Sequence, residues 1–343
     1  MQDYLTYYKN KTVLVTGGAG AVGSNLVRAL ARLDAKAVIV LDDLSSGYDW
    51  NVPDLPNVLF VKGSVVDEIA LKRVYGLHPE IVFHLAAFFA NQNSVDYPER
   101  DLKVNGLGTL RVFEYAQLAG VQRVIYASSG CAIYGDAPLP LAEHMQSMYL
   151  SSPYQITKML GELYANFFRQ HHGLSLVKAR LFNSYGPGEV PGQYRNVIPN
   201  FIYWALMGQA LSITGNHLAT RDFTYVDDVV DAMLRSGYFD AADGLEINIG
   251  SGLETPIRQL AEQVNTLTGN QSGVSVIHRR KWDTKDRLRA DISRARQVLG
   301  YEPGMEFSSG LARTVDWFRD NWQNIASDAE FPPGSSSALS PLS

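Results

Sequence analysis

The sequence predicts an α/β fold in which a doubly wound parallel sheet carries a smaller, discontinuous second domain. Short apolar runs at 11–16, 37–41 and 81–85 alternate with helical runs such as 24–33 and 68–75. Buried parallel strands are apolar throughout and are joined by helices, so this alternation is typical of βαβ units. A glycine-rich turn follows the first apolar run, and such turns bind nucleotides at the carboxyl ends of parallel strands.

Composition narrows the class of protein further. The chain has 343 residues, 46% hydrophobic, and a formal net charge of −5 at pH 7. That length suits one large α/β unit or two domains, and the charge gives no reason to expect nucleic acid as a partner. No apolar run reaches the ~18 residues that a membrane helix needs. The single cysteine permits no internal disulfide, so we expect a cytoplasmic protein. Because no apolar run is long enough to span a membrane, we expect no membrane partner. The tail 329–343 is expected to be disordered.

The glycine-rich turn predicts a dinucleotide site. Gly17, Gly20 and Gly23 lie between the first strand and the helix that begins at Ser24. They permit a tight turn and a close approach of the backbone to a diphosphate, which then faces a helix N-terminus. Asp42 follows Gly23 by 19 residues, near the spacing of a carboxylate that binds the adenosine ribose. A carboxylate there repels a 2′-phosphate, so the motif favours NAD over NADP.

A tyrosine and a lysine stand at the start of a predicted helix, 153–171. Tyr154 and Lys158 are four residues apart and therefore share one face, with Ser151 or Ser152 as the helix cap. An ammonium beside a phenol favours the phenolate, so the pair could supply a base near neutral pH. The opposite face of this helix is apolar, and it either packs on the sheet or forms a dimer interface. That second face consists of Ile156, Leu160, Leu163 and Phe167.

Ordered motifs along 11–320 resemble the extended short-chain dehydrogenase/reductase superfamily, in its branch of nucleotide-sugar epimerases and dehydratases. They are TGGAGAVGS at 16–24, LDDLSSG at 41–47, HLAA at 84–87, VN at 104–105, SS at 128–129 with IYG at 133–135, YxxxK at 154–158, RLFNSYGP at 180–187 and RDFTYV at 221–226. The likeness is closest to 4-epimerases of UDP-hexoses and UDP-hexuronates. It implies a Rossmann-type NAD domain, 1–185 with 221–247, and a nucleotide-sugar domain, 186–220 with 248–328. It also implies a homodimer through helices 98–118 and 153–171.

The resemblance also implies which residues contact ligands, and no metal is expected among them. For NAD they are Gly17, Gly20, Ala21, Val22, Gly23, Asp42, Asp43, Ser45, Ser46, Gly47, Ser64, Val65, Leu85, Ala86, Ala87, Asn105, Tyr154, Lys158 and Phe182. For the nucleotide sugar they are Ser129, Gly130, Asn183, Arg195, Asn196, Val197, Arg221 and Arg287, with Arg289 as the alternative to Arg287. Arg195 is hypothesised to meet a carboxylate at C6 of the sugar.

The implied chemistry is oxidation at the sugar C4. Tyr154 takes the O4 proton while a hydride passes to NAD, and Lys158 binds the nicotinamide ribose and lowers the pKa of Tyr154. The serine or threonine that bridges O4 and the tyrosine falls on Gly130 when counted from Tyr134. Ser128 and Ser129 come one position early, so either Ser129 or a water bridges, and Ser129 is favoured.

The loop after this serine pair decides the fate of the 4-keto sugar. Related 4,6-dehydratases carry Asp-Glu where this chain has Cys131 and Ala132, and related decarboxylases carry a Glu at the second position. Without these carboxylates, 4-epimerisation is the predicted reaction. Cys131 leaves 3,5-epimerisation open, because related 3,5-epimerases use a cysteine beside this serine pair, although its interpretation as a small buried hydrophobe is favoured. Dehydration stays open as well, and so does a non-catalytic NAD-binding scaffold.

Overall fold

The computed structural model describes residues 4–216, 218–278 and 285–331. Seven parallel strands form the central sheet in the order β11-β6-β5-β4-β1-β2-β3. Their bounds are β1 Thr12–Thr16, β2 Ala37–Asp42, β3 Val58–Lys62, β4 Ile81–His84, β5 Arg123–Ser129, β6 Leu176–Leu181 and β11 Glu246–Ile249. The strand order reverses at β1, between β4 and β2, which is where doubly wound sheets bind ligands. The prediction of an α/β fold with a Rossmann-type sheet is confirmed.

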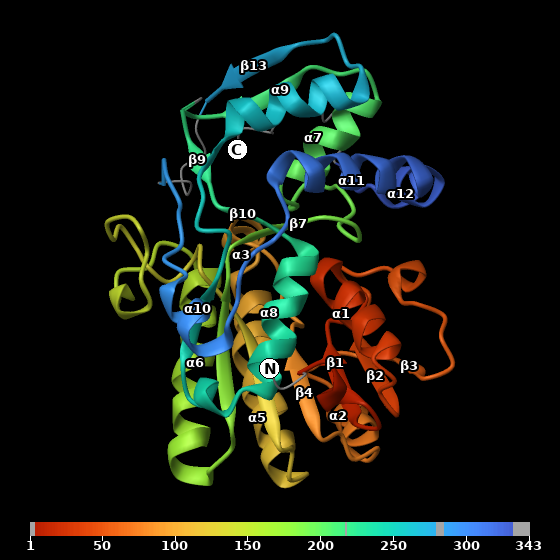
Figure 1. The fold of residues 1–343 in the computed structure, drawn as a ribbon, viewed down its shortest axis with the longest axis vertical. Helices are drawn as coiled ribbons and strands as arrows, with labels where there is room; N and C mark the ends of the chain where they lie inside the picture. The colour runs from red at the N-terminus through yellow and green to blue at the C-terminus, as the bar shows by residue number, and fades with distance from the viewer. Residues whose placement is uncertain (1–3, 217, 279–284, 332–343) are drawn as a thin grey trace.

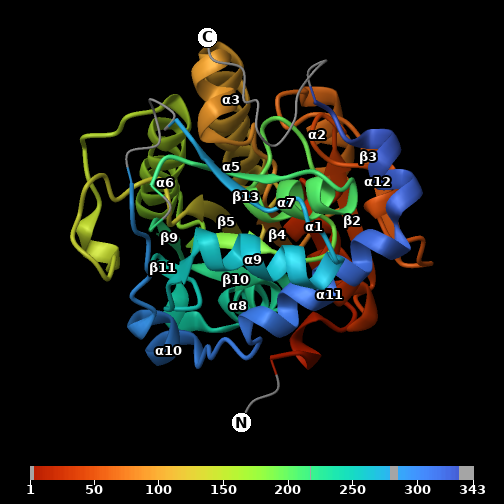
Figure 2. The same ribbon diagram turned by 90° about the horizontal axis from the view of Figure 1, so that it is seen from above.

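Helices cover both faces of this sheet because its strands are apolar on both sides. Val13 and Val15 of β1 belong to one core, and Leu14 between them belongs to the other, as the two-residue period of a strand requires. Helices α1 (Ala21–Arg32) and α8 (Val226–Tyr238) cover the first core. Helices α2 (Glu68–Tyr75), α5 (Thr109–Leu118) and α6 (Pro153–His172) cover the second. Figure 2 shows α5 and α6 on one side of the sheet and α8 on the other.

The predicted helix 98–118 is helical along its length, but it is not one regular α-helix. It consists of α4 (Pro98–Asp101), a π-helical segment η3 (Leu102–Gly108) and α5. Asn105 lies in the π-helical segment, where its side chain binds the backbone of Phe88 in the loop after β4. Short π-helical segments inside α-helices occur mostly at functional sites. The remaining short elements of this half are α3 (Asn91–Asp96) and the helical turns η1 (Thr6–Tyr8), η2 (Asp49–Asn51), η4 (Glu143–Met145) and η5 (Asp240–Ala242).

A second group of elements packs above the carboxyl ends of the strands, as Figure 1 shows. It has its own apolar core, which includes Phe201, Leu260 and Leu311. The elements are α7 (Val197–Leu206), β8 (Leu211–Thr214), α9 (Ile257–Thr268), β13 (Val274–Ile277), α11 (Phe307–Asp320) and α12 (Trp322–Asp328). Two short strand pairs join this group to the sheet, β7 (Asn183–Tyr185) with β10 (Phe223–Tyr225) and β9 (Thr220–Arg221) with β12 (Thr255–Pro256). Helix α10 (Ser293–Leu299) packs on the first core of the sheet through Ala295 and Leu299.

Residues 329–331, which we expected to begin a disordered tail, make defined contacts in the structure. Glu330 pairs with Gly192, and its carbonyl accepts a hydrogen bond from Gln193 N at 2.9 Å. The Phe331 ring lies 4.5 Å from the Trp204 ring, centroid to centroid. The prediction was therefore wrong for 329–331, because an aromatic side chain that follows a polar stretch found an apolar partner on α7. Residues 332–343 lie outside the described part of the chain. Within the described part, no helix combines the length and apolar character that membrane crossing requires.

Candidate active site

A cavity opens at the carboxyl ends of the central strands. Its wall includes residues that follow β1, β2, β4, β5 and β6, from Gly17 through Asp42 and Leu85 to Ser129 and Phe182. Of the residues predicted to bind NAD, the structure places all but Asn105 along this cavity. Asn105 is buried instead, and its side chain pairs with both backbone groups of Phe88, at 2.7 and 3.1 Å. The prediction that Asn105 contacts NAD is corrected accordingly: it holds the loop after β4 in place.

The glycine-rich turn forms one end of the cavity and leaves no room for side chains. Gly17 has φ +74°, and a Cβ on it would lie 2.6 Å from Ala86 N. A Cβ on Gly23 would lie 2.1 Å from Gly17 O. Helix α1 follows directly, and its N-cap residue, Gly20, provides no side-chain hydrogen bond to the first turn. The amides of that turn are thus available to an anion, and this cradle fits the diphosphate of a dinucleotide.

Asp42 ends β2 at the same end of the cavity. Its carboxylate accepts hydrogen bonds from Ala19 N at 3.0 Å and Leu44 N at 2.9 Å. Burial raises the pKa of this carboxyl, and these two bonds oppose that effect. The two amides fix the orientation of the carboxylate, as a group that positions ribose hydroxyls requires. The cradle and the acid together fit NAD, as the sequence predicts.

Tyr154 and Lys158 lie on the first turns of α6, where the local sequence fixes the helix start. Ser152 is the N-cap and accepts a hydrogen bond from Gln155 N, and Pro153 occupies the first turn. Both catalytic candidates line the cavity and are almost fully buried. The Lys158 ammonium donates to Ala127 O at 2.9 Å and lies 5.6 Å from the centre of the Tyr154 ring. The helix therefore brings the pair together at the end of β5.

The electrostatics of this pair differ from the expectation. Burial raises the pKa of Tyr154, the charge of Asp101 adds to this, and a hydrogen bond with Ser129 opposes it. Burial also lowers the pKa of Lys158, to about 8, with Asp101 opposing. Desolvation is the largest of these effects, so the pKa of Tyr154 is raised, whereas the sequence predicted that Lys158 would lower it.

The two serines at the end of β5 have separate roles in the structure. Ser128 Oγ donates to Glu162 Oε1 at 2.5 Å, one turn beyond Lys158 on α6. Ser129 lines the cavity together with Tyr154, and its side chain lowers the pKa of that tyrosine. Of the two, Ser129 is therefore the serine that meets the tyrosine, and Ser128 is bound to a carboxylate.

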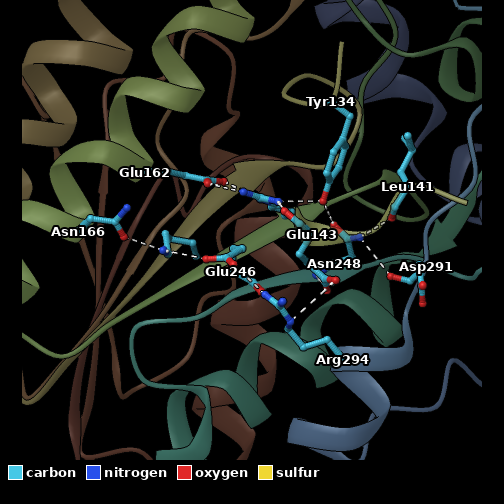
Figure 3. Close-up of polar contacts among 11 residues, drawn as sticks. Tyr134, Leu141, Glu143, Glu162, Asn166, Glu246, Asn248, Asp291 and Arg294 are labelled. Atoms are coloured by element: carbon cyan, nitrogen blue, oxygen red, sulfur yellow. Dashed lines mark hydrogen bonds and ion pairs between the residues drawn. The ribbon is translucent and has the colours of Figure 1, made fainter. Parts of the chain in front are cut away.

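A buried polar network continues from Glu162 under the loop after β5. Arg180 donates to both oxygens of Glu162, at 2.9 and 2.7 Å, and to Tyr134 OH at 3.0 Å. The Tyr134 hydroxyl donates to Asn248 Oδ1, and Asn248 Nδ2 donates to Leu141 O at 2.7 Å. Figure 3 shows these side chains pointing toward one another from α6, β6, β11 and the loop. The network ties the loop that follows Ser129 to the strands on which it lies.

The predicted substrate residues divide into two groups. Ser129, Asn183, Arg195 and Asn196 line the cavity, whereas Gly130, Val197, Arg221 and Arg287 are not among its lining residues. Gly130 has no room for a side chain, because a Cβ there would lie 2.1 Å from the Phe182 ring. Val197 is the first residue of α7. Arg221 donates to Thr220 O at 2.8 Å, and Arg287 forms an ion pair with Glu254 at 2.6 Å.

Arg195 lies beside the loop that follows β2. Its guanidinium donates to Ser46 O at 2.7 Å, on the side of the cavity where the adenosine ribose is expected. This conformation gives no support to a role for Arg195 at C6 of the sugar. Nearby, Glu189 is buried and accepts from Asn196 Nδ2 at 2.7 Å. Burial raises the pKa of Glu189 to about 7.

Sequence reasoning missed three residues of this region: Glu162, Glu189 and Lys285. Glu162 carried a usable signal, because it stands four residues after Lys158 and so shares its helical face. Lys285 carried none, since Cys131 is 154 positions away, and Glu189 contacts Asn196 across an irregular loop whose spacing predicts no contact. Cys131, which we interpreted from the sequence as a small buried hydrophobe, is half-buried and lines the cavity. Burial raises the pKa of its thiol to about 11, and the thiol donates to Asn183 Oδ1 at 3.3 Å.

A glycine cradle and a ribose-binding acid that share a cavity with a Tyr–Lys pair define an enzyme that works with a bound dinucleotide. Comparison with known proteins identifies the family to which this enzyme belongs. Residues 13–250 match the NAD dependent epimerase/dehydratase family. The chain is 39% identical over 314 residues to the UDP-glucose 4-epimerase of Mycolicibacterium smegmatis, which covers 90% of this chain and 99% of the relative.

Solved structures agree with this match. The epimerase Mth375 of Methanothermobacter thermautotrophicus is 54% identical, with a TM-score of 0.95 over 96% of this chain and 98% of that one. The UDP-glucose 4-epimerase of Thermotoga maritima, solved with UDP-glucose, is 36% identical, with a TM-score of 0.86 over 91% and 99%. The chain belongs to the NAD dependent epimerase/dehydratase family. The predictions of NAD as cofactor and of a nucleotide-sugar 4-epimerase are confirmed.

Proposed function

We propose that this enzyme interconverts the C4 epimers of a UDP-hexose or UDP-hexuronate through a 4-keto intermediate. The observation that carries the proposal is that Tyr154, Lys158 and Ser129 line the same cavity as the glycine cradle. The choice of UDP rests on the relatives from M. smegmatis and T. maritima. The sugar itself is left as a hexose or a hexuronate.

Each residue of the pair has a defined task in this proposal. Tyr154 accepts the proton of the sugar O4 during oxidation and returns it afterwards, and the Ser129 hydroxyl aligns O4 with the phenol. Lys158 is held by Ala127 O and holds the ribose next to the nicotinamide. When bound, NAD supplies the hydride acceptor and a positively charged ring. The Ser129 side chain lowers the pKa of Tyr154 and so favours the phenolate, whereas burial of the phenol has the opposite and larger effect.

The positions of the carboxylates in the described wall of the cavity favour epimerisation over dehydration. They are Asp42 and Asp43, at the end of β2, and Glu189, beside Asn196. The charge of Asp101 raises the pKa of Tyr154, but Asp101 itself is fully buried and accepts hydrogen bonds from Thr157 and Asn105. Dehydration needs an acid at C6 and a base at C5, and 4-epimerisation needs neither. A thiol with a pKa of about 11 is almost entirely protonated at neutral pH and so provides little thiolate base, which disfavours 3,5-epimerisation by Cys131.

We further propose the domain division and the homodimer that the sequence predicts. Residues 1–185 with 221–247 hold NAD, and 186–220 with 248–328 hold the nucleotide sugar. On α6, the side chains of Ile156, Leu163 and Phe167 are 53%, 52% and 44% exposed, so they do not pack on the sheet. Leu102 and Leu107 of the neighbouring segment η3 are also exposed, and a second copy would cover this face. A single cysteine fits a reducing cytoplasm.

The test is conversion of a panel of UDP-, dTDP-, GDP- and CDP-sugars in D₂O, with products read by NMR. We expect C4 epimers of a UDP-sugar without deuterium on carbon, because the hydride returns from the cofactor. Deuterium at C3 or C5 would favour 3,5-epimerisation or dehydration. A Tyr154→Phe variant should lose conversion by ~10²-fold or more while keeping its NAD. A wild-type enzyme that binds NAD and converts no nucleotide sugar would support the scaffold interpretation.

A further inference from the structure

One cation outside the predicted site lies against the wall of the cavity. The Lys285 ammonium donates to Cys131 O at 3.4 Å. Cys131 lines the cavity, and its thiol donates to Asn183 Oδ1, another lining atom. The charge of Cys131 raises the pKa of Tyr154, so the same wall lies close to this tyrosine. Lys285 therefore reaches the loop that faces the reacting sugar, although it comes from the second group of elements.

A second cation stands beside the first. Arg221 donates to Asp286 O at 3.4 Å, next in sequence to Lys285, and its charge lowers the pKa of Lys285 after the larger effect of burial. Both cations act on the Cys131 thiol, where they lower a pKa that burial raises. The charge of Asp136 raises the pKa of Lys285 and so opposes the effect of Arg221. Two like charges at a partly buried wall repel each other, and an anionic ligand between them relieves that repulsion.

The neighbouring arginines lie in different surroundings. Arg287 donates to both oxygens of Glu254, at 2.8 and 2.6 Å, on the protein surface. The Nε of Arg289 is buried without a hydrogen-bond partner, and its charge acts on Glu254 and Asp291. Of the three cations in 285–289, Lys285 is thus the one whose hydrogen bond leads to the cavity wall.

We propose that Lys285 binds an anionic oxygen of the nucleotide-sugar substrate at the wall formed by Cys131 and Asn183. The oxygen belongs either to the diphosphate or to a carboxylate at C6. The proposal rests on the proposed function, since it assumes that the cavity accepts a nucleotide sugar. It assigns to Lys285 the role that sequence reasoning gave to Arg287 or Arg289.

The experiment compares wild-type enzyme with Lys285→Met, Lys285→Arg and, as a control, Lys72→Met, an exposed lysine on α2. Affinity for UDP is measured by calorimetry, and KM and kcat are measured with UDP-glucose and UDP-glucuronate. Loss of a charge-assisted hydrogen bond predicts a change of ~10-fold or more. If the diphosphate is bound, Lys285→Met weakens UDP by that factor. If the carboxylate is bound, UDP affinity is unchanged and only the KM of UDP-glucuronate rises. Lys285→Arg should restore most of either loss.

UDP affinity and both KM values within twofold of wild type in Lys285→Met would overturn the proposal. An equal loss in Lys72→Met would do the same, because it would show a general effect of charge. Failure of the proposed function looks different: the wild-type enzyme itself would convert neither sugar. Thermal unfolding and NAD content of each variant show whether the fold is retained.

Discussion

Glu162 and Arg180 form a buried ion pair that joins helix α6 to strand β6. Two hydrogen bonds connect them, from Nε to Oε1 at 2.9 Å and from Nη2 to Oε2 at 2.7 Å. Their side chains are only 5% and 1% exposed. Because the same carboxylate accepts from Ser128, the pair supports the strand end from which Ser129 meets Tyr154.

Removing one partner of this pair should destabilise the protein strongly. We expect Glu162→Gln to lower the free energy of unfolding by ~3–5 kcal/mol, since it leaves the Arg180 charge buried without a counterion. Urea denaturation measures the change. Glu68→Gln is the matched control, because Glu68 forms exposed ion pairs with Lys72 and Arg111 and should cost below ~1 kcal/mol. Equal losses in the two variants would contradict the prediction.

The two serines at the end of β5 should separate stability from catalysis. Ser129→Ala should lower kcat by ~10²-fold, because it removes the hydroxyl beside the Tyr154 phenol. Ser128→Ala should instead lower the melting temperature, with kcat changed only a few-fold, since Ser128 binds Glu162. Steady-state kinetics and thermal unfolding of both variants test these two expectations. Full turnover in Ser129→Ala would assign the bridging role to water.

The glycine cradle should tolerate no side chain. A methyl group on Gly23 would approach Gly17 O to 2.1 Å, so Gly23→Ala should displace the turn and lose bound NAD. Gly304→Ala is the control, because its new methyl would meet Asp228 Oδ1 at 3.9 Å. NAD is quantified after release from the purified proteins. Gly23→Ala with a full complement of NAD would show that the dinucleotide binds elsewhere.

Glu189 should make stability depend on pH. Its pKa is raised to about 7 in the folded protein, from an ordinary value of 4.5. Between these values the folded state holds a proton that the unfolded state releases, so the free energy of unfolding falls as pH rises. The fall approaches about 3 kcal/mol above pH 7. Relative to Glu189→Gln, wild type should lose stability between pH 5 and 7.5, as followed by urea midpoints. Parallel curves would refute this, and exposed Glu99→Gln is the control.

The apolar face of α6 should control the oligomeric state. Phe167→Glu places a charge on the proposed dimer interface and should convert a dimer to monomers, as measured by light scattering after gel filtration. Ile69 on α2 is more exposed, at 79%, and Ile69→Glu should leave the dimer intact. A monomeric wild-type protein, or a dimer that survives Phe167→Glu, would exclude this interface.

Local patterns were enough for the frame of the molecule. Helix α2 has the predicted bounds, because its periodicity and its flanking polar residues lie within a few positions. The glycine turn and the start of α6 were also predictable, since a turn, a cap and an i,i+4 pair are defined by neighbours in sequence. The contacts of residues 329–331 were not predictable, because Phe331 packs on a residue more than a hundred positions earlier.

Which side chains meet in the site depended on contacts between distant segments. Ser128 is separated from Glu162 by 34 positions and Lys285 from Cys131 by 154, and no local spacing encodes such pairs. The pKa of Tyr154 was misjudged for a related reason. The Tyr–Lys spacing reveals the nearby charge, whereas the burial that outweighs it exists only once the sheet, α6 and the loop after β5 are packed together. The sequence thus specified the enzyme class, and folding specified how its charges are balanced.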